Sequence, residues 1–381
     1  MVTFFLIIAL AKIVHIVSFN VPYPPDYGGI IDVFYKVKAL HDCGVDVILH
    51  CYEYGRTGDK KLNEICKKIY FYKRKKGLKY NFSFIPYIVK TRFSDELLSD
   101  LKQDDFPVLF EGLHTTAIIP QLLAKDRKIV VRTHNIEHEY YNELSKAESD
   151  LFRKLFFYIE SRKLKSYQQV LQKANQIAAI SPSDYTYFNN LFGKTTYIPV
   201  FHLFKNVIIL KGTGEYALFH GNLSVPENIK TALFLVNEIF NALEIPFVIA
   251  GKNPNIKIIN AASENNLIKI IANPSENEMD TLLSNAQLNI LTTFQNTGIK
   301  LKLLAALYRG RHCIVNSQMV ENTDLESLCI VADSKNEIKA KINELFTKPF
   351  NETEVLKRQQ ILDEKFSTNK SALKLIDILF S

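Results

Sequence analysis

Short, continuous apolar runs alternate along the first half of the chain with stretches in which apolar residues recur every three or four positions. The runs are rich in β-branched residues and fall at residues 12–19, 45–52, 107–112, 128–133 and 176–181. Such runs are expected of strands that are covered on both faces, as in a parallel sheet. The stretches between them, for example 30–44 and 183–193, have the spacing of amphipathic helices. This order of strands and helices predicts a parallel α/β sheet.

The same order begins again after a break at residues 199–215, where Pro199, Gly212 and Gly214 indicate a crossing between domains. Further strands are predicted at residues 215–221, 246–251, 267–272, 287–293, 312–316 and 328–333, and helices at 228–243, 275–286 and 300–310. A chain of 381 residues is also too long for one ordinary core of ~150 residues.

We therefore predict an α/β protein built from two Rossmann-like, doubly wound domains. The first domain is expected at residues 1–200 and the second at 201–350, followed by C-terminal helices at 351–381 that can pack back on the first domain. Two such sheets would face each other across a cleft at the carboxyl ends of their strands, where α/β proteins bind ligands.

Composition excludes several classes of protein. A hydrophobic fraction of 47% and an aromatic fraction of 12% exclude intrinsic disorder. The net charge of +7 is too small to indicate nucleic-acid binding by itself. The five cysteines form neither a CxxC pair nor a Cys/His ligand spacing. We therefore expect no structural zinc, no disulfide framework and a reducing, cytoplasmic location.

The beginning of the chain is the first of two segments that bear on membranes. Residues 3–11 are almost wholly apolar, but they are too short to span ~30 Å of hydrocarbon, and no basic residue precedes them as in a signal peptide. We expect a packed or frayed extension, with a membrane-associating tail as the alternative. No later run reaches ~18 apolar residues, which predicts a protein that is soluble or peripheral to a membrane.

The second segment is a basic run at residues 60–80, with nine Lys or Arg, interleaved aromatic residues and one acid, Glu64. Three interpretations remain open: a solvated face, a nucleic-acid surface, or contact with the headgroups of an anionic membrane. Between the two binding functions we favour an anionic membrane or a lipid-linked sugar, and we expect no nucleic acid. The protein would then lie at the inner face of the membrane.

The loop after the first predicted strand has features of a phosphate site. Pro22, Pro24 and Pro25 stiffen it, while Gly28 and Gly29 remove side chains where the next helix begins. Exposed amides and the helix dipole favour an anionic group there, although a tight turn is the alternative. The pattern is not G-x-G-x-x-G, which argues against a dinucleotide oxidoreductase.

Several segments together resemble a known family. PYPPDYGGIIDVFYKVKALHDCGVDVILHCY, RTHNIEHEYYNEL, AAISPSDYTYF, HGNLSVPENIKTALFLVNEIF and TGIKLKLLAALYRGRHCIVN occur in the order and spacing of the GT-B glycosyltransferases of the large retaining family four. The resemblance implies transfer of a sugar, with retention, from a nucleoside diphosphate sugar to a glycan or lipid-linked acceptor, as in polysaccharide biosynthesis. It implies no metal cofactor. It also implies that Gly221 and Asn222 approach the donor, and that Gly28 and Gly29 approach the donor phosphates, with the acceptor as the alternative.

The predicted helix at 300–310 carries lysines in its first turn. Gly298 precedes the helix, and Lys300 and Lys302 follow. Lysine at a helix N-terminus opposes the helix dipole, so the arrangement favours a bound anion over a solvated charge. Residues two apart point ~200° apart, so only one of the two lysines should face a cleft. The resemblance implies that Lys302 is the catalytic residue beside the donor diphosphate, with Lys300 as the alternate and Gly298 as a donor contact.

The same segment departs from the family pattern, which commonly has two glutamates eight positions apart. Thr297 and Ala305 stand at those positions here, with Thr297 expected near the donor sugar. Ala305 cannot accept a hydrogen bond from a ribose hydroxyl, and Thr297 carries no charge. Two alternatives therefore stay open: a catalytically silent GT-B protein that binds a sugar nucleotide or partner, and a sugar-nucleotide epimerase of the same fold.

Polar residues also follow two predicted strands of the first domain. His114 lies just after the strand at 107–112; a lone histidine is usually structural, but its position matches a family histidine that touches the donor sugar, which implies a catalytic role. His134, Asn135 and Glu137 crowd the turn after the next strand and suggest an acceptor site, with a helix start capped by Asn135 as the alternative. We expect no metal at His134, Glu137 and His138, because no further ligand is evident.

Overall fold

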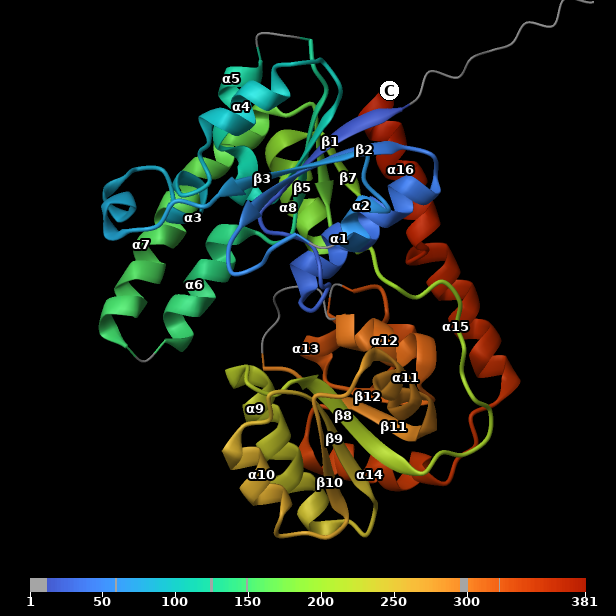
Figure 1. Ribbon diagram of the computed structural model, residues 1–381. Helices are drawn as coiled ribbons and strands as arrows, with labels where there is room; N and C mark the ends of the chain where they lie inside the picture. The colour runs from blue at the N-terminus through green and yellow to red at the C-terminus, as the bar shows by residue number, and fades with distance from the viewer. Residues whose placement is uncertain (1–11, 59, 124–125, 149, 295–300, 322) are drawn as a thin grey trace, which may run out of the picture. The chain divides into compact units, whose positions relative to one another are not determined.

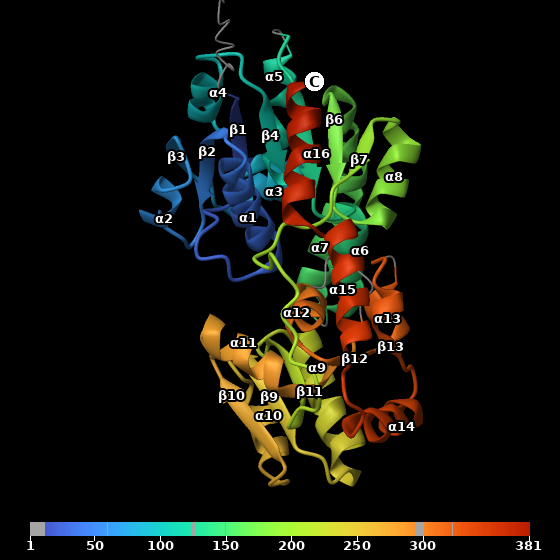
Figure 2. The same ribbon diagram turned by 90° about the vertical axis from the view of Figure 1, so that its right-hand side faces the viewer.

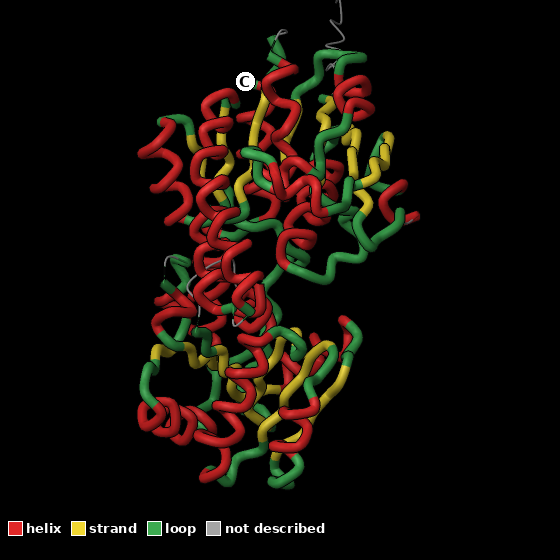
Figure 3. The backbone as a smooth tube through the Cα atoms, turned by 90° about the vertical axis from the view of Figure 1, so that its left-hand side faces the viewer, coloured by secondary structure: helices red, strands yellow, loops and turns green. Residues whose placement is uncertain are grey.

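The computed structural model describes residues 12–58, 60–123, 126–148, 150–294, 301–321 and 323–381, which form two compact units (Figure 1). The first unit consists of the chain up to Leu203 together with the C-terminal segment Thr368–Ser381. The second covers Phe204–Ser367. Each unit is a parallel sheet with helices on its faces, so the predicted α/β class with two Rossmann-like domains is confirmed (Figure 3).

The first sheet has seven parallel strands in the order β3-β2-β1-β4-β5-β6-β7. The order runs outward in one direction from β1 and in the other from β4, as in a doubly wound sheet. Its strands are β1 (Ile13–Ser18), β2 (Asp46–Glu53), β3 (Lys68–Lys73), β4 (Val108–Glu111), β5 (Ile129–Thr133), β6 (Gln176–Ala179) and β7 (Thr195–Tyr197).

The second sheet has six parallel strands in the order β10-β9-β8-β11-β12-β13. Its direction changes between β8 and β11, so this unit has the same winding as the first. Its strands are β8 (Tyr216–Asn222), β9 (Phe247–Lys252), β10 (Ile268–Ala272), β11 (Ala286–Leu291), β12 (His312–Val315) and β13 (Ile330–Val331).

Helices connect the strands in both units. Those of the first unit are α1 (Gly28–Asp42), α2 (Lys60–Asn63), α3 (Tyr87–Lys90), α4 (Asp95–Leu101), α5 (Ile119–Leu122), α6 (Glu137–Ala147), α7 (Leu151–Tyr167), α8 (Pro182–Phe192) and α16 (Thr368–Phe380), with 3₁₀ turns η1 (Leu78–Phe82), η2 (Leu113–Ile118) and η3 (Gln168–Lys173). Those of the second are α9 (Pro226–Phe234), α10 (Ile256–Ala262), α11 (Glu276–Asn285), α12 (Leu301–Arg309), α13 (Ser317–Val320), α14 (Lys335–Phe346) and α15 (Glu352–Lys365), with the π turn η4 (Leu235–Ile239) and the 3₁₀ turns η5 (Phe240–Ala242) and η6 (Glu326–Leu328).

Local sequence explains where several helices begin and end. The Ser181 hydroxyl accepts a hydrogen bond from the Asp184 amide at the start of α8, Pro182 follows it, and Gly193 ends the helix in the left-handed conformation with φ of 68°. Three helices of the second unit begin with a reciprocal capping box: Ser275 with Glu278, Ser334 with Glu337, and Asn351 with Glu354.

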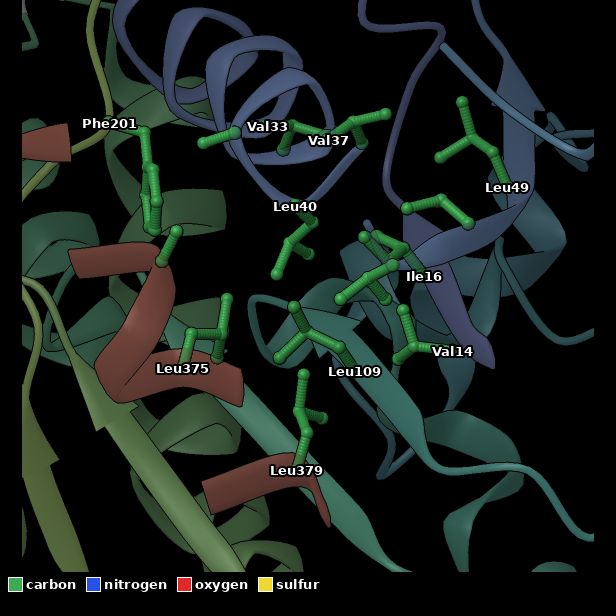
Figure 4. Close-up of a cluster of buried hydrophobic side chains, with 14 of the residues drawn as sticks. Val14, Ile16, Val33, Val37, Leu40, Leu49, Leu109, Phe201, Leu375 and Leu379 are labelled. Atoms are coloured by element: carbon green, nitrogen blue, oxygen red, sulfur yellow. The ribbon is translucent and has the colours of Figure 1, made fainter. Parts of the chain in front are cut away.

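One of the two core clusters of the first unit lies between the sheet and two helices from opposite ends of the chain. Leu375 and Leu379 of α16 pack into the same apolar cluster as Val33 and Val37 of α1 and Leu109 of β4 (Figure 4). Figure 2 shows α16 against the first sheet beside α1, whereas α15 belongs to the second unit. The last helix therefore completes the hydrophobic core of a domain whose sheet begins the chain.

The connection after β4 is one place where the structure differs from the helical spacing of the sequence. The helix expected after β4 is a 3₁₀ turn, η2, followed by the short α5. Gly112 enters the turn with φ of 68°, and the Thr115 and Thr116 hydroxyls donate to backbone carbonyls three or four residues earlier, which competes with regular helix bonding. None of the helices in the described part of the chain has the length and apolarity needed to cross a membrane.

Candidate functional site

The carboxyl ends of the strands in the second unit carry the residues predicted to contact a donor. Gly221 and Asn222 end β8, and Asn228 lies in the first turn of α9, where its side-chain amide donates to the Asn222 carbonyl oxygen at 2.9 Å. Neighbouring β9 approaches closely: a Cβ atom at Gly251 would lie 1.7 Å from the Gly221 carbonyl oxygen. Gly251 is therefore required for the two strand ends to meet.

Lys302 is the second residue of α12 and reaches the same place. Its Nζ donates to Asn228 Oδ1 at 3.2 Å and lies 5.4 Å from the centre of the Phe219 ring. Asn228 thus joins Lys302 to Asn222, a link that sequence reasoning missed because an asparagine near a helix start is usually a cap. The structure brings Lys302, Gly221 and Asn222 together.

The imidazole of His220 lies beneath this group. Burial, with a smaller contribution from the charge of Lys302, lowers the pKa of His220 to about 3. Its Nε2 atom is buried and has no hydrogen-bond partner among the described residues. At neutral pH His220 is therefore uncharged, and the positive charge beside it belongs to Lys302.

The segment that leads toward α12 is held by polar contacts. The Thr293 hydroxyl donates to Glu227, and Thr293 exchanges backbone hydrogen bonds with the Asn316 side chain at 3.0 and 2.7 Å. Thr297, Gly298 and Lys300, which were predicted as donor or catalytic residues, lie outside the described residues.

Ala305 shares a face of α12 with Lys302, since residues three apart on a helix are neighbours. Ala305 is half-buried, as Lys302 is, whereas Leu303, Leu304 and Ala306 between and beyond them are buried. A larger side chain at position 305 would therefore extend beside Lys302 rather than into the core.

In the first unit, the predicted glycine pair begins α1. A Cβ atom at Gly29 would lie 2.9 Å from the Phe19 ring, whereas one at Gly28 would meet nothing within 4 Å. The Phe19 ring also lies 5.4 Å from the ring of His114 and 5.5 Å, edge-on, from that of His134. Phe19 therefore contacts Gly29, His114 and His134 at the ends of β1, β4 and β5, a role that no pattern in the sequence indicates.

Behind His134 lies a fully buried set of charged side chains. Lys36 Nζ is 2.9 Å from an Asp32 oxygen and 2.6 Å from a Glu111 oxygen, and the other Asp32 oxygen is 2.9 Å from Arg132. His134 Nε2 lies 2.9 Å from Glu111 Oε2. Two carboxylates and two cations thus balance each other inside the protein, as buried charges must.

The charges in this cluster set the ionisation of its carboxyl groups. Burial acts to raise the pKa of Asp32, but the charges of Arg132 and Lys36 outweigh it and hold that pKa far below its usual value. For Glu111, burial is likewise outweighed by Lys36 and by the hydrogen bond from His134, so its pKa is also lowered. Both groups are therefore carboxylates at neutral pH.

Asp32, Glu111 and His134 are also the group in the described residues close enough to ligate a metal ion, with ligand atoms within 4.8 Å of one another. Lys36 already occupies the space between the two carboxylates with its ammonium group. A cation would have to displace it, so the donor set does not suit a metal.

Glu137 begins α6 and is 3% exposed. Burial, and then the nearby Asp184, raise the pKa of Glu137 to about 8, and burial raises that of Asp184 to about 6. Glu137 also receives a hydrogen bond from the half-buried Asn135 side chain. Glu137 therefore lies within the unit behind Asn135.

His114 is the neighbour of Glu137 on the other side. Its Nδ1 atom is 3.9 Å from Glu137 Oε1, which is longer than a hydrogen bond, and neither atom has a hydrogen-bond partner among the described residues. Burial, and then the charge of Arg92, lower the pKa of His114 well below its ordinary value. His114 is therefore neutral.

Two parallel, doubly wound sheets with polar residues at their strand ends define the GT-B class of fold, and comparison with solved structures agrees. Sucrose-phosphate synthase from Thermosynechococcus elongatus matches with a TM-score of 0.68 and 13% identity, over 96% of this chain and 98% of that one. Trehalose-6-phosphate synthase OtsA matches with a TM-score of 0.67 and 11% identity, over 97% and 99% of the two chains. A mutant of S. aureus TarM, in complex with fondaparinux, α-GlcNAc-glycerol and UDP, matches with a TM-score of 0.63 and 12% identity, over 97% and 100%. This chain therefore has the fold of GT-B glycosyltransferases, as the resemblance implied.

Comparison with known sequences finds fewer matches than comparison with solved structures. No protein-family model matches the chain. A relative from Klebsiella pneumoniae, the "uncharacterized 44.6 kDa protein in cps region", is 27% identical over 266 residues. The match covers 68% of this chain and 66% of the relative, which is just under two thirds of its length.

Proposed function

We propose that this protein transfers a sugar from a nucleoside diphosphate sugar to a glycan or lipid-linked acceptor. The proposed donor class is supported most directly by the position of Lys302 in the first turn of α12. Lys302 donates to Asn228, whose side chain in turn bonds to Asn222 next to Gly221. An ammonium group, backbone amides and a helix dipole at one place suit a diphosphate.

The proposed chemistry follows from the leaving group, which is the nucleoside diphosphate. The bond from the anomeric carbon to the β-phosphate oxygen breaks, and the acceptor hydroxyl oxygen bonds to that carbon. With retention, which the family resemblance implies, the hydroxyl proton passes to the departing diphosphate. Lys302 would stabilise the negative charge that grows on this group, which is commonly the largest catalytic contribution. A divalent metal is then not needed, so we propose none.

We assign the acceptor to the first unit. His134 is held by Glu111, Asn135 lies beside it, and His114 presents a neutral imidazole at the next strand end. Neutral imidazoles and amides both donate and accept hydrogen bonds, as recognition of sugar hydroxyls requires. Glu137 would act by positioning Asn135, from which it receives a hydrogen bond. We propose that the reaction takes place in the cytoplasm, at the inner face of the membrane.

Donor binding is tested first by thermal shift with UDP-, GDP- and ADP-sugars, because a ligand at ~100 times its dissociation constant stabilises the folded protein by ~2.7 kcal/mol. Turnover is then measured as release of the nucleoside diphosphate. Lys302→Ala should abolish turnover with little change in melting temperature, since this half-buried side chain is not part of the buried apolar core. Lys257→Ala is the matched control, because Lys257 is also the second residue of a helix, α10. A near-wild-type rate for Lys302→Ala at saturating donor would refute the diphosphate assignment.

Ala305 favours one second candidate, a GT-B protein that binds a sugar nucleotide without transfer. The half-exposed methyl group beside Lys302 offers no hydrogen-bond acceptor to a ribose. A thermal shift without nucleoside diphosphate release, over a broad set of acceptors, would favour binding alone.

A further inference from the structure

Helix α7 has an exposed apolar face. Phe152 is 86% exposed and Leu155 is 56% exposed, and the same face continues with exposed Leu151, Tyr158 and Ile159. The opposite face, which packs on the unit, buries Leu164 together with the polar residues Glu160 and Ser161. An ordinary surface helix leaves no such apolar face exposed.

The buried polar residues fix α7 in this orientation. Glu160 accepts a hydrogen bond from the Tyr87 backbone amide at 2.6 Å and another from Lys163 at 2.9 Å. The Ser161 hydroxyl donates to the His138 carbonyl oxygen at 2.7 Å. Turning the helix to bury its apolar face would leave these groups unpaired, so the apolar face stays outside in the folded protein.

A second exposed apolar segment adjoins α7. Leu78, Phe82 and Phe84, in and after η1, are among the most exposed large apolar side chains. Lys163 of α7 donates to the Asn81 carbonyl oxygen at 2.8 Å, which joins this segment to the helix. We call the two together the α7–η1 surface: Leu151, Phe152, Leu155, Tyr158, Ile159, Leu78, Phe82 and Phe84. Apolar patches of this kind mark contact with a membrane or another protein.

The charges around the α7–η1 surface select between those partners. The exposed charged residues of α7 are all basic: Arg153, Lys154, Arg162 and Lys165. Residues 65–94, which contain η1, include nine Lys or Arg and no acid. Two copies of this chain paired about a twofold axis would place these cations against each other, which is unfavourable. A partner with negative charge around an apolar interior fits better.

We propose that the α7–η1 surface inserts into the headgroup and acyl boundary of an anionic bilayer. The helix would lie in the plane of the membrane, with its apolar face down and its basic residues among the lipid phosphates. The basic run alone would give salt-sensitive attraction, whereas α7 adds a contribution from apolar burial that salt does not screen. The proposal is independent of the sugar transfer proposed above.

A neighbouring cavity supports hydrocarbon as the partner. It measures about 240 Å³ and is lined by Ile85, Lys90, Phe93, Ala117, Pro120, Gln121, Tyr167 and Val170. Ile85 follows directly on the exposed segment that ends at Phe84. A mainly apolar cavity with one lysine in its wall suits the chain of an anionic amphiphile better than a polar peptide.

The absence of tryptophan from the chain gives a direct test. Phe152→Trp introduces a single indole into the α7–η1 surface, and Leu356→Trp introduces one on α15, where Leu356 is 57% exposed. With vesicles of phosphatidylglycerol and phosphatidylcholine, the emission of Phe152→Trp should shift to shorter wavelength and be quenched by brominated acyl chains. The emission of Leu356→Trp should not change. Unchanged emission from both variants would overturn the proposal.

A second test separates insertion from electrostatic attraction. At ~1 M salt the Debye length is only ~3 Å, so the remaining vesicle binding reports insertion. Phe152→Gln with Leu155→Gln should lower the remaining partition coefficient about tenfold or more. Leu356→Gln, at a position as exposed as Leu155, should leave it unchanged, and melting temperatures should show that all variants fold.

Two further outcomes of the second test would count against insertion. Equal vesicle binding by the double variant and the wild type would overturn the proposal. So would a wild-type dimer that the double variant converts to a monomer, because a second copy would then cover the surface. Transfer to a soluble acceptor should be the same in all these variants, which keeps a failure here distinct from a failure of the proposed activity.

Discussion

Replacement of Lys36 by methionine should destabilise the first unit and reverse the pH dependence of its stability. Lys36 is fully buried, with its ammonium group 2.9 Å from Asp32 and 2.6 Å from Glu111. Methionine has a similar length and packs well against apolar neighbours such as Phe201. The variant therefore removes one charge with little change in volume, and Arg132 is left to balance two buried carboxylates.

The expected cost is that of breaking a buried ion pair, about 3–5 kcal/mol. For a domain of this size each kcal/mol lowers the melting temperature by ~2–4 °C, so the transition of the first unit should fall by roughly 6–20 °C. Lys38→Met is the matched control, since Lys38 lies on the same helix and also pairs with an aspartate four residues away, Asp42, at 3.4 Å. Both partners are about two-fifths exposed, so that pair should contribute only ~0.3–0.5 kcal/mol.

The pH dependence distinguishes loss of charge balance from loss of packing. In the wild type the pKa values of Asp32 and Glu111 are lowered by folding, so their contribution is present above pH ~4 and is lost as the pH falls. Without Lys36, burial is less opposed and at least one carboxyl pKa should rise. That group then favours the folded state at low pH and loses its contribution as the pH rises.

Scanning calorimetry between about pH 5 and pH 8 measures both effects, because the two units can melt separately. The difference in melting temperature between Lys36→Met and the wild type should grow with pH. Adding Glu111→Gln to Lys36→Met removes the excess carboxylate and should recover part of the loss. A loss no larger than that of Lys38→Met, or a difference that does not vary with pH, would refute the charge-balance argument.

Three further changes test other parts of the molecule. Ala305→Glu should alter donor affinity, measured by titration calorimetry, without a large fall in melting temperature, because Ala305 is only half-buried. Aggregation of the variant would instead show that position 305 belongs to the core. Glutamine at all four positions 73–76 should reduce co-sedimentation with anionic vesicles at low salt, since each basic residue near the membrane surface contributes ~1 kcal/mol to binding. Transfer to a soluble acceptor should be unchanged. Equal binding to neutral and anionic vesicles would show that the basic run is only a solvated face. Glu137→Gln should raise the melting temperature more at pH ~8 than at pH ~5. Folding raises the pKa of Glu137 to about 8, so the carboxyl group of the wild type loses its stabilising contribution as the pH rises. An equal change in melting temperature at both pH values would contradict this pKa shift.

The central strands of both sheets could be predicted from the sequence, and two edge strands could not. Strands such as β1 and β5 are buried on both faces and therefore appear as continuous apolar runs. β3 and β7 lie at the two edges of the first sheet, and their residues are largely half-buried or exposed. β3 moreover falls inside the basic run, where charge obscures the alternation that would identify a strand.

The candidate site was predictable one strand end at a time, because polar residues directly after a buried strand gather at one edge of a parallel sheet. The partners of those residues were not. His134 pairs with Glu111, whereas the sequence grouped it with Glu137 and His138, which are its neighbours in the chain. The spacing of Asp32 and Lys36 shows a helical pair, but nothing local indicates that Glu111, 75 residues beyond Lys36, completes it.

Helix α7 shows why a hydrophobic pattern cannot by itself say which face of a helix is buried. Its apolar residues recur at helical spacing, and that pattern alone would place Leu151, Leu155 and Ile159 in the core. The structure turns the other face inward, where Leu164 joins the core and Glu160 and Ser161 bond to the Tyr87 amide and the His138 carbonyl oxygen. One buried leucine and a few hydrogen bonds can therefore outweigh the burial of an apolar stripe, provided that the stripe gains a partner elsewhere. An anionic bilayer, as proposed above, would supply that partner without any change in the fold of the unit, so membrane contact and internal hydrogen bonding would account together for a sequence that neither explains alone.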